Sequence, residues 1–262
     1  MKKLYCIPKI DEIEQYCSFS NEFNAGFEYN DFFLPGILDD EIRTNSLINL
    51  YTHLDRDRSC DTLHGAFLDI CINSDDPYII KVSNFRIRQC MDIGRKLGVK
   101  AIIFHTNNIP YFRLDSYRKN WLNRNAAYWD KITDEYPDIN IYIENMFDEA
   151  PLLLGQLASM MTDNSHFGIC LDFAHAFLSD TPLEAWSGTL KPFTRHLHIN
   201  DNDRYQDLHA PVGSCQFPWE FYRQFIDSFS EPEKPSVLIE VSGYDKLIKS
   251  VEYMQKNHLY PL

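Results

Sequence analysis

Short apolar runs that alternate with stretches of helical spacing are the feature that most constrains the fold of this chain. Between the runs lie segments such as residues 87–97, in which apolar side chains recur every three or four positions before Gly98, and residues 152–161. Alternation of this kind is typical of parallel β/α units, and eight units in 262 residues favour a closed barrel over a doubly wound sheet. The eight predicted strands cover residues 3–7, 24–29, 61–67, 99–105, 139–144, 166–172, 195–200 and 236–241.

The length and the even composition of the chain predict a single domain. Hydrophobic residues make up 44% and charged residues 24%, which is typical of a globular protein. No Gly/Ser-rich or Pro-rich linker divides the sequence, and it contains no repeat. We therefore expect an α/β protein with one (β/α)8 TIM-barrel domain over residues 1–262.

The alternation of side chains along the predicted strands places polar groups inside the barrel at the strand ends. In IYIEN, Ile141 and Ile143 face the helices, so Glu144 faces the interior. The C-terminal ends of barrel strands form the face on which active sites are built. The inward strand-end residues predicted in this way are His64, His105, Glu144, Asp172, His198 and Glu240.

The convergence of these six residues predicts a metal site. One inward polar residue is usually a satisfied buried group, but six at one barrel mouth are costly to bury unless water, protons or cations offset their charge. With no thiolate in the set, the donors favour Zn or Mn, with Co or Mg as alternatives, and one to three ions. Glu144 is placed to bridge two ions. His175, three residues after Asp172, and the pair Asp207 and His209 add donors for a further ion or for substrate.

The remaining histidines and the cysteines are predicted to be structural. We expect His196 to lie in the barrel interior below His198, and His53, His166 and His258 to be surface or core residues. The seven cysteines are odd in number and never spaced as C-x-x-C, which indicates reduced thiols.

The net charge of −13 argues against polyanionic partners. We find no basic patch that would bind nucleic acid or an anionic membrane surface. The apolar run after Lys2 and Lys3 is short and soon followed by charged residues, unlike a signal peptide, and no run reaches membrane-spanning length. We therefore expect a cytoplasmic protein that acts on a small molecule.

At this point the motifs resemble the xylose-isomerase-like TIM barrel superfamily, which includes endonuclease IV and the sugar phosphate isomerases/epimerases. The matching stretches are LHGAFLDI (63–70), LGVKAIIFH (97–105), IYIEN (141–145), CLDFAHAF (170–177), LHINDND (197–203), DLHAPVG (207–213) and LIE (238–240). In the isomerases a single ion is typically held at the positions of Glu144, Asp172, His198 and Glu240. The resemblance also implies that nine residues match the positions that hold three zinc ions in endonuclease IV: His64, His105, Glu144, Asp172, His175, His198, Asp207, His209 and Glu240.

The departures from endonuclease IV favour the isomerase branch. Endonuclease IV carries a His-Val-Ser motif on its first strand and basic or aromatic loops that penetrate DNA, whereas residues 4–11 read LYCIPKID. The second strand, in AGFEYNDFF (25–33), has Glu28 at its end and resembles the Glu-ending strand of the isomerases/epimerases. Residues 201–219 are also similar to the isomerase pattern, although Ser214-Cys215 replaces an acidic residue followed by glycine.

We therefore expect a metal-dependent isomerase or epimerase of a sugar or sugar phosphate, in which Glu144 and Glu240 exchange a carbon-bound proton. One alternative is a zinc-dependent phosphodiesterase of the endonuclease IV type that acts at abasic sites in DNA, against which the charge argues. A non-catalytic metal-binding module is the other alternative. The residues predicted to contact substrate are His175 and Arg204, as groups that orient hydroxyls or a phosphate, and Phe33, Tyr111 and Trp219, as apolar walls.

Overall fold

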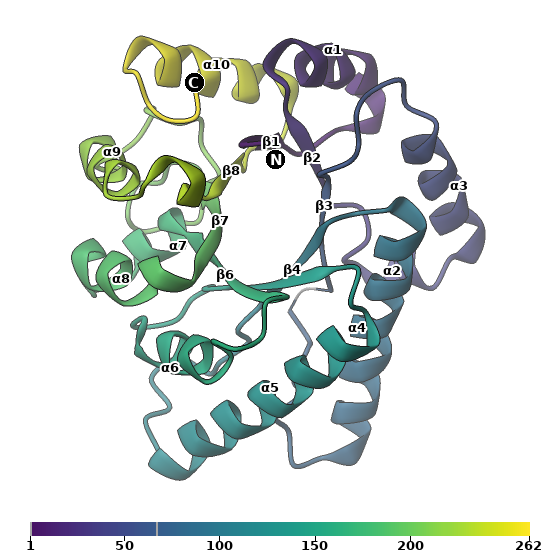
Figure 1. Cartoon of the computed structure of the whole chain (residues 1–262), viewed down its shortest axis with the longest axis vertical. Coiled ribbons are helices and arrows are strands. Elements are labelled where there is room, and N and C mark those ends of the chain that lie inside the picture. Colours follow the sequence, from purple (N-terminus) through teal and green to yellow (C-terminus); the bar gives the residue numbers. More distant parts are fainter. Residues whose placement is uncertain (1, 67) are drawn as a thin grey trace.

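A closed barrel of eight parallel strands forms the centre of the computed structural model, which describes residues 2–66 and 68–262 (Figure 1). Each strand pairs with its neighbours in sequence, and β1 pairs with β8 to close the barrel. All eight predicted strands are confirmed, while Phe67, at the end of the predicted 61–67 run, lies outside the described residues. The strands are β1 (Leu4–Cys6), β2 (Gly26–Tyr29), β3 (Thr62–His64), β4 (Ala101–His105), β5 (Asn140–Glu144), β6 (Phe167–Asp172), β7 (Thr194–Ile199) and β8 (Ser236–Ile239).

Helices surround the strands and complete the predicted (β/α)8 TIM barrel (Figure 1). Helix α4 shows how local sequence sets the ends of a helix. The Asp76 side chain accepts a hydrogen bond from the Tyr78 N–H at the start of α4, and Gly98 ends that helix at a φ of 73°. The helices are α1 (Ile13–Phe23), α2 (Pro35–Leu38), α3 (Glu41–Thr52), α4 (Pro77–Leu97), α5 (Asp115–Glu135), α6 (Leu152–Met160), α7 (Phe173–Leu178), α8 (Leu183–Leu190), α9 (Trp219–Asp227) and α10 (Tyr244–Lys256), with short 3-10 helices η1 (Ile10–Glu12), η2 (Lys191–Phe193) and η3 (Glu231–Glu233).

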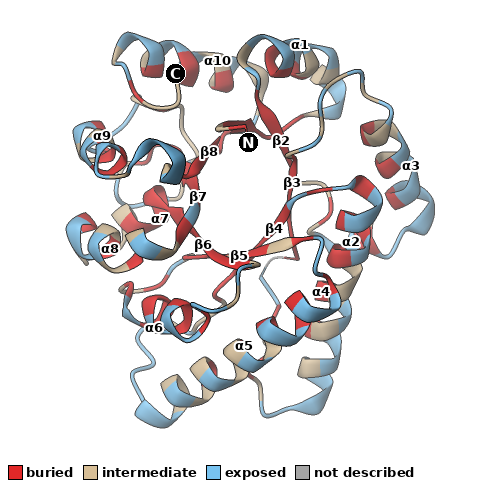
Figure 2. Cartoon of the chain, in the orientation of Figure 1, coloured by how far each residue is buried: buried red, intermediate tan, exposed pale blue. Residues whose placement is uncertain are grey.

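The main apolar core lies between the strands and the ring of helices, as the buried inner faces of the helices show (Figure 2). The outward-facing Ile141 and Ile143 belong to this core. A separate small apolar cluster of Tyr5, Ile7 and Leu238 belongs to the barrel interior. The predicted strand alternation is therefore confirmed, and it turns the opposite side chains toward the barrel axis.

The histidine predicted to lie below His198 is found there. His196 is fully buried, and its ring centroid lies 5.3 Å from that of His198. All seven cysteines are free thiols. Among the described helices, none is both long and apolar enough to cross a membrane. His53 and His258 are exposed and His166 is half-buried, as expected of histidines outside the site.

Candidate metal centre

Four strand-end side chains form the buried cluster, which we define as Glu144, Asp172, His198 and Glu240. Their donor atoms all lie within 4.8 Å of one another. Glu144, Asp172 and His198 are 0% exposed, and Glu240 is 6% exposed. His198 Nδ1 lies 3.2 Å from Glu144 Oε1 and 3.6 Å from Glu240 Oε2. Because these residues end neighbouring strands β5 to β8, the barrel itself brings the four predicted ligands together.

A second group, the side cluster, consists of His64, His105 and Glu144. It shares Glu144 with the buried cluster, but through the other carboxylate oxygen. Glu144 Oε2 lies 3.7 Å from His64 Nε2 and 3.3 Å from His105 Nε2. The two oxygens of Glu144 therefore face two different clusters, as expected for a carboxylate that bridges two ions.

A third group, the outer cluster, consists of His175, Asp207 and His209. Asp207 Oδ2 lies 3.4 Å from His175 Nε2 and 3.2 Å from His209 Nε2. The side chains of Asp207 and His209 are 24% and 35% exposed, unlike the buried cluster. His175 comes from α7, and the other two come from the long segment between β7 and α9, so no strand end supplies this cluster.

The donor atoms have the spacing and the lack of partners that a divalent ion would satisfy. Contacts between an imidazole nitrogen and a carboxylate oxygen in the three clusters run from 3.2 to 3.7 Å. Ligands about 2.0–2.2 Å from a tetrahedral zinc ion lie about 3.4 Å apart. Both oxygens of Glu144, Oδ2 of Asp172 and Nδ1 of His198 are buried, and none has a hydrogen-bond partner among the described residues. The residues present therefore fit a zinc or manganese site.

Burial and crowding perturb the ionisation of the buried cluster. Burial, together with the carboxylates of Glu240 and Glu144, raises the pKa of Asp172 to about 8. Burial also opposes ionisation of Glu144, yet the imidazoles of His198 and His105 hold the pKa of Glu144 well below its usual range. In the metal-free protein, protons thus offset part of the carboxylate charge, and an ion would replace them.

Both imidazoles of the outer cluster are also held in the protonated form. Burial lowers the pKa of His209, but the carboxylates of Glu240 and Asp207 outweigh it and raise that pKa to about 10. Burial likewise opposes protonation of His175, whereas Asp172 and Asp207 hold its pKa well above the usual range. An ion bound here must displace protons from both imidazoles.

A cavity of about 210 Å³ opens beside the clusters. Apolar side chains and donor side chains both line it, and no lysine or arginine is found among the described lining residues. Its lining consists of Asn30, Phe33, His64, His105, Met146, Phe147, His175, Asp207, His209 and Glu240.

Comparison with known proteins agrees with this arrangement. The model of the xylose isomerase-like TIM barrel family matches residues 26–256. The chain belongs to this family. A probable endonuclease 4 from Halorhodospira halophila is 21% identical over 216 residues, which cover 73% of this chain and 71% of that protein.

Two solved structures of similar proteins share the whole xylose isomerase-like barrel. A Thermus thermophilus protein soaked with zinc chloride has a TM-score of 0.75 at 20% identity, covering 98% of this chain and 97% of that one. A D-tagatose 3-epimerase-like protein has a TM-score of 0.75 at 19% identity, covering 99% and 98%. At these identities the likeness shows the fold, and the match to the family model confirms the expected xylose isomerase-like resemblance.

Within this family barrel, the structure brings all nine predicted metal ligands to one mouth but separates the five predicted substrate contacts. Phe33 and His175 line the cavity. Tyr111 is 65% exposed, and neither Tyr111 nor Arg204 is among the lining residues; the Arg204 guanidinium lies 5.6 Å from the centre of the Phe177 ring instead.

Trp219 does not line the cavity either, because its indole is buried and holds a loop. Its Nε1–H donates to Asp201 Oδ2 at 3.0 Å. Asp201 also accepts three backbone N–H groups of the same segment, and its own backbone pairs in both directions with Ala210 at 3.0 Å. Trp219 and Asp201 therefore hold in place the segment that carries two members of the outer cluster.

The strand-end sequence motifs also contain an unpredicted structural residue, Asn145. Its side chain donates to the carbonyl of Asp172 and accepts from the Asp172 N–H, both at 2.9 Å. This pairing ties the ends of β5 and β6 together. Asn145 follows Glu144 directly in IYIEN. From sequence alone, an asparagine that links two strand ends cannot be told from one in a surface loop.

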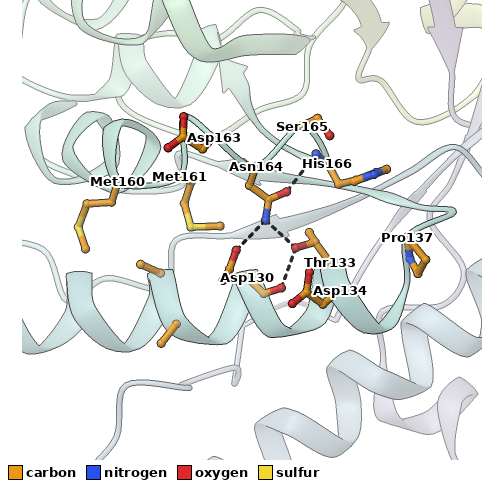
Figure 3. A pocket seen from close by; sticks show the side chains of 12 residues that line it. Asp130, Thr133, Asp134, Pro137, Met160, Met161, Asp163, Asn164, Ser165 and His166 are labelled. Carbon is orange, nitrogen blue, oxygen red and sulfur yellow. Dashed lines mark hydrogen bonds between the residues drawn. The ribbon is translucent and has the colours of Figure 1, made fainter.

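A larger hollow of about 600 Å³ lies near the opposite ends of β5 and β6 (Figure 3). Its polar groups pair with one another: Asn164 Nδ2 donates to Asp130 Oδ1 at 3.0 Å and to Thr133 Oγ1 at 2.7 Å. Asn164 Oδ1 accepts from the His166 N–H at 3.1 Å. The smaller cavity at the mouth, which lies beside the three clusters, is therefore the candidate functional site.

Proposed function

We propose that the protein is a divalent-metal-dependent isomerase or epimerase that transfers a proton on a small sugar or sugar phosphate. One observation carries the proposal: two strand-end carboxylates, Glu144 and Glu240, face the same atom, His198 Nδ1, beside a cavity of about 210 Å³. This arrangement supports an acid and a base on either side of one proposed metal position. The D-tagatose 3-epimerase-like protein supports the proposal through the fold alone.

The chemistry divides between the ion and the two carboxylates. A bound divalent ion would polarise the substrate oxygen and stabilise the negative charge that develops when a neighbouring carbon loses its proton. Glu240 lines the cavity and is placed to exchange that proton with the substrate. Glu144 lies behind it, fully buried, and would act as the partner acid or base. Phe33 and His175 would orient the substrate from the cavity wall.

A second candidate, phosphoester hydrolysis, is favoured by the side cluster. With that cluster filled, both oxygens of Glu144 face an ion, and Glu144 has no free oxygen for proton transfer. Clustered ions instead generate hydroxide and neutralise a scissile phosphate. The occupancy of the side cluster therefore distinguishes the two reactions.

The surface near the mouth disfavours abasic-site DNA as the substrate. The net charge is −13, and duplex affinity comes mainly from phosphate neutralisation by Lys and Arg. Two of the arginines near the mouth are already engaged: Arg113 and Arg118 pair with Glu149 at 2.9 and 3.0 Å. We propose a small-molecule substrate in the cytoplasm, and the seven free thiols are consistent with a reducing compartment.

Solvent exchange tests the proposal. Protein loaded with Zn or Mn is incubated in deuterated water with a panel of ketoses and ketose phosphates, and deuterium at carbon is read by mass spectrometry. We expect metal-dependent exchange on at least one member, absent in the Glu144→Gln variant. Abasic-site duplex and a small phosphodiester are assayed in parallel. Cleavage of either one, with no exchange on the panel, would instead support hydrolysis.

A further inference from the structure

His198 is oriented differently from three other histidines of the mouth. Those three present Nε2 to a cluster and place Nδ1 against a backbone carbonyl. His198 presents Nδ1 to the buried cluster, at 3.2 Å from Glu144 Oε1, so its Nε2 points deeper into the barrel. The three Nδ1 contacts are His64 with Gly65 O (3.1 Å), His175 with Asn145 O (3.0 Å) and His209 with Glu240 O (3.1 Å).

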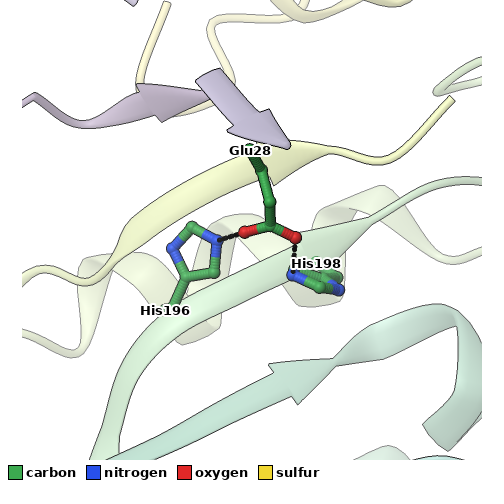
Figure 4. Close-up of side chains that lie close together, drawn as sticks. All are labelled: Glu28, His196 and His198. Atoms are coloured by element: carbon green, nitrogen blue, oxygen red, sulfur yellow. Dashed lines mark ion pairs between the residues drawn. The ribbon is translucent and has the colours of Figure 1, made fainter. Parts of the chain in front are cut away.

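The group that meets His198 Nε2 is the carboxylate of Glu28 on β2 (Figure 4). Glu28 Oε1 lies 3.1 Å from His198 Nε2, and Glu28 Oε2 lies 3.3 Å from His196 Nε2. The Thr62 hydroxyl donates to Oε2 at 2.8 Å. Beyond it, His196 Nδ1 lies 2.7 Å from Ser236 Oγ. The side chains that make this series of contacts all lie in the barrel interior.

The arrangement around Glu28 differs from that of an ion-binding cluster. In the outer cluster, a single oxygen, Asp207 Oδ2, faces both imidazoles, so three donors converge on one point. Glu28 instead directs a different oxygen to each imidazole. Glu28, His196 and His198 do offer donor atoms within 4.8 Å of one another, but the separate oxygens make the contacts a chain that leads to His198.

Burying a charged carboxylate at this depth costs free energy unless neighbouring groups stabilise its charge. Glu28 is 0% exposed, and the neighbouring interior layer is filled by apolar Tyr5 and Leu238. A carboxylate on the second nitrogen of a ligating imidazole fixes its tautomer and makes the other nitrogen a stronger ligand. The position of Glu28 matches that role.

We propose that Glu28 is a positioning residue of the metal centre. Its carboxylate keeps the proton of His198 on Nε2 and holds the ring so that Nδ1 is directed at an ion in the buried cluster. His196 and Ser236 hold the second oxygen of Glu28 from the far side. The inference rests on the metal centre and not on the reaction proposed for it, so it is tested without substrate.

The test compares Glu28→Gln with Glu28→Asp, and with Glu149→Gln as a matched control. Gln keeps the shape of Glu28 and removes the charge, while Asp keeps the charge but withdraws it from both imidazoles. Glu149 follows the strand that ends at Glu144, but its carboxylate pairs with Arg113 and Arg118 and belongs to none of the clusters. Zinc affinity and stoichiometry are measured by competition with a chromophoric chelator, the visible spectrum is recorded after loading with Co²⁺, and the melting temperature is measured without metal.

We expect Glu28→Gln to bind its tightest zinc ion about 10- to 100-fold more weakly. The stoichiometry at saturation should not change, because no ligand is removed, and the Co²⁺ absorption bands should shift. Glu28→Asp should be intermediate, and Glu149→Gln should match the unmodified protein. A melting temperature that does not fall in the metal-free variants separates this effect from a general loss of structure.

Several results would overturn the inference. An unchanged zinc affinity and Co²⁺ spectrum in Glu28→Gln would reduce Glu28 to a structural role. Loss of one whole equivalent of zinc at saturation would make Glu28 a ligand itself. If Glu28→Gln does not fold, unchanged affinity in Glu28→Asp decides against the proposal. Failure of the unmodified protein to take up any ion would remove the metal centre, and this result is distinct from the others.

Discussion

The buried cluster and the outer cluster use similar side chains but are built in different ways. The buried cluster takes Glu144, Asp172, His198 and Glu240 from the ends of adjacent strands, where they are almost inaccessible to solvent. The outer cluster takes its members from a helix and a loop, and Asp207 and His209 of this cluster are partly exposed. A rigid set of four donors should bind an ion more tightly than three donors on a loop, because less freedom is lost on binding.

The largest effect should come from substituting Glu144, the residue that the buried and side clusters share. Glu144→Gln keeps the shape of Glu144 but removes the negative charge from both oxygens that face imidazoles. We expect the exchange activity to fall about 10²- to 10⁴-fold, and the bound metal, measured by elemental analysis, to fall with it. The circular dichroism spectrum should be retained. Normal metal content in this variant would contradict the site, and Glu149→Gln provides the control.

A selective effect should follow from a change in the outer cluster. Asp207→Asn removes the only carboxylate of that cluster, so an ion there would have just two neutral imidazoles. We expect the variant to lose the weakest zinc equivalent, detected by chelator titration, while the tightest ion stays bound with the affinity of the unmodified protein. If the stoichiometry is one ion in both proteins, the outer residues are assigned to substrate instead.

A fall in pH should separate the two clusters without mutation. Two of the three donors of the outer cluster are imidazoles, which lose their ligand function when protonated, whereas the buried cluster has one imidazole among four donors. Because protons and metal compete for the same atoms, acidification should remove the outer ion first and the buried ion later. Metal content measured after dialysis from pH 8 down to about pH 5, the acid side of the ordinary histidine pKa of about 6.5, should fall in steps. Simultaneous loss of all metal would contradict the difference between the clusters.

The smallest effect should come from Trp219→Phe. This change removes the indole N–H from Asp201 but leaves the three backbone donors to that carboxylate. We expect the free energy of unfolding, measured with urea, to fall by about 1 kcal/mol. Zinc affinity should weaken a few-fold at the outer cluster only, since Asp201 holds the loop that carries Asp207 and His209. A weaker buried site would show that this loop supports the whole mouth.

The same comparison explains what the sequence could and could not predict. The alternation of side chains in IYIEN turns Glu144 inward, because two apolar neighbours must face the helices. Strand-end donors such as Asp172 and His198 are therefore predictable from local pattern alone. The members of the outer cluster lie on a helix and a loop, where no such periodicity applies, and the sequence left open whether they hold a further ion or contact substrate.

Substrate contacts on loops could not be predicted reliably for the same reason, because no side-chain periodicity applies to loops. Trp219 is a large aromatic residue near two predicted donors in sequence, which favoured a place in the cavity wall. In the structure the buried carboxylate of Asp201 accepts the indole N–H, and the ring is turned away from the mouth. The partner that decides its position is 18 residues away, so spacing could not reveal it. The role of Glu28 could not be predicted for a similar reason, because its partners His196 and His198 lie on a strand far away in sequence.

Anomalous diffraction at the zinc edge, from crystals grown with one equivalent of zinc, tests the central claim most directly. The metal centre predicts one dominant peak within about 2.0–2.2 Å of donor atoms of Glu144, Asp172, His198 and Glu240. Excess zinc should add a weaker peak at His175, Asp207 and His209. A dominant peak at the outer cluster, or no peak at the barrel mouth, would contradict the claim that the buried strand-end cluster is the principal metal site.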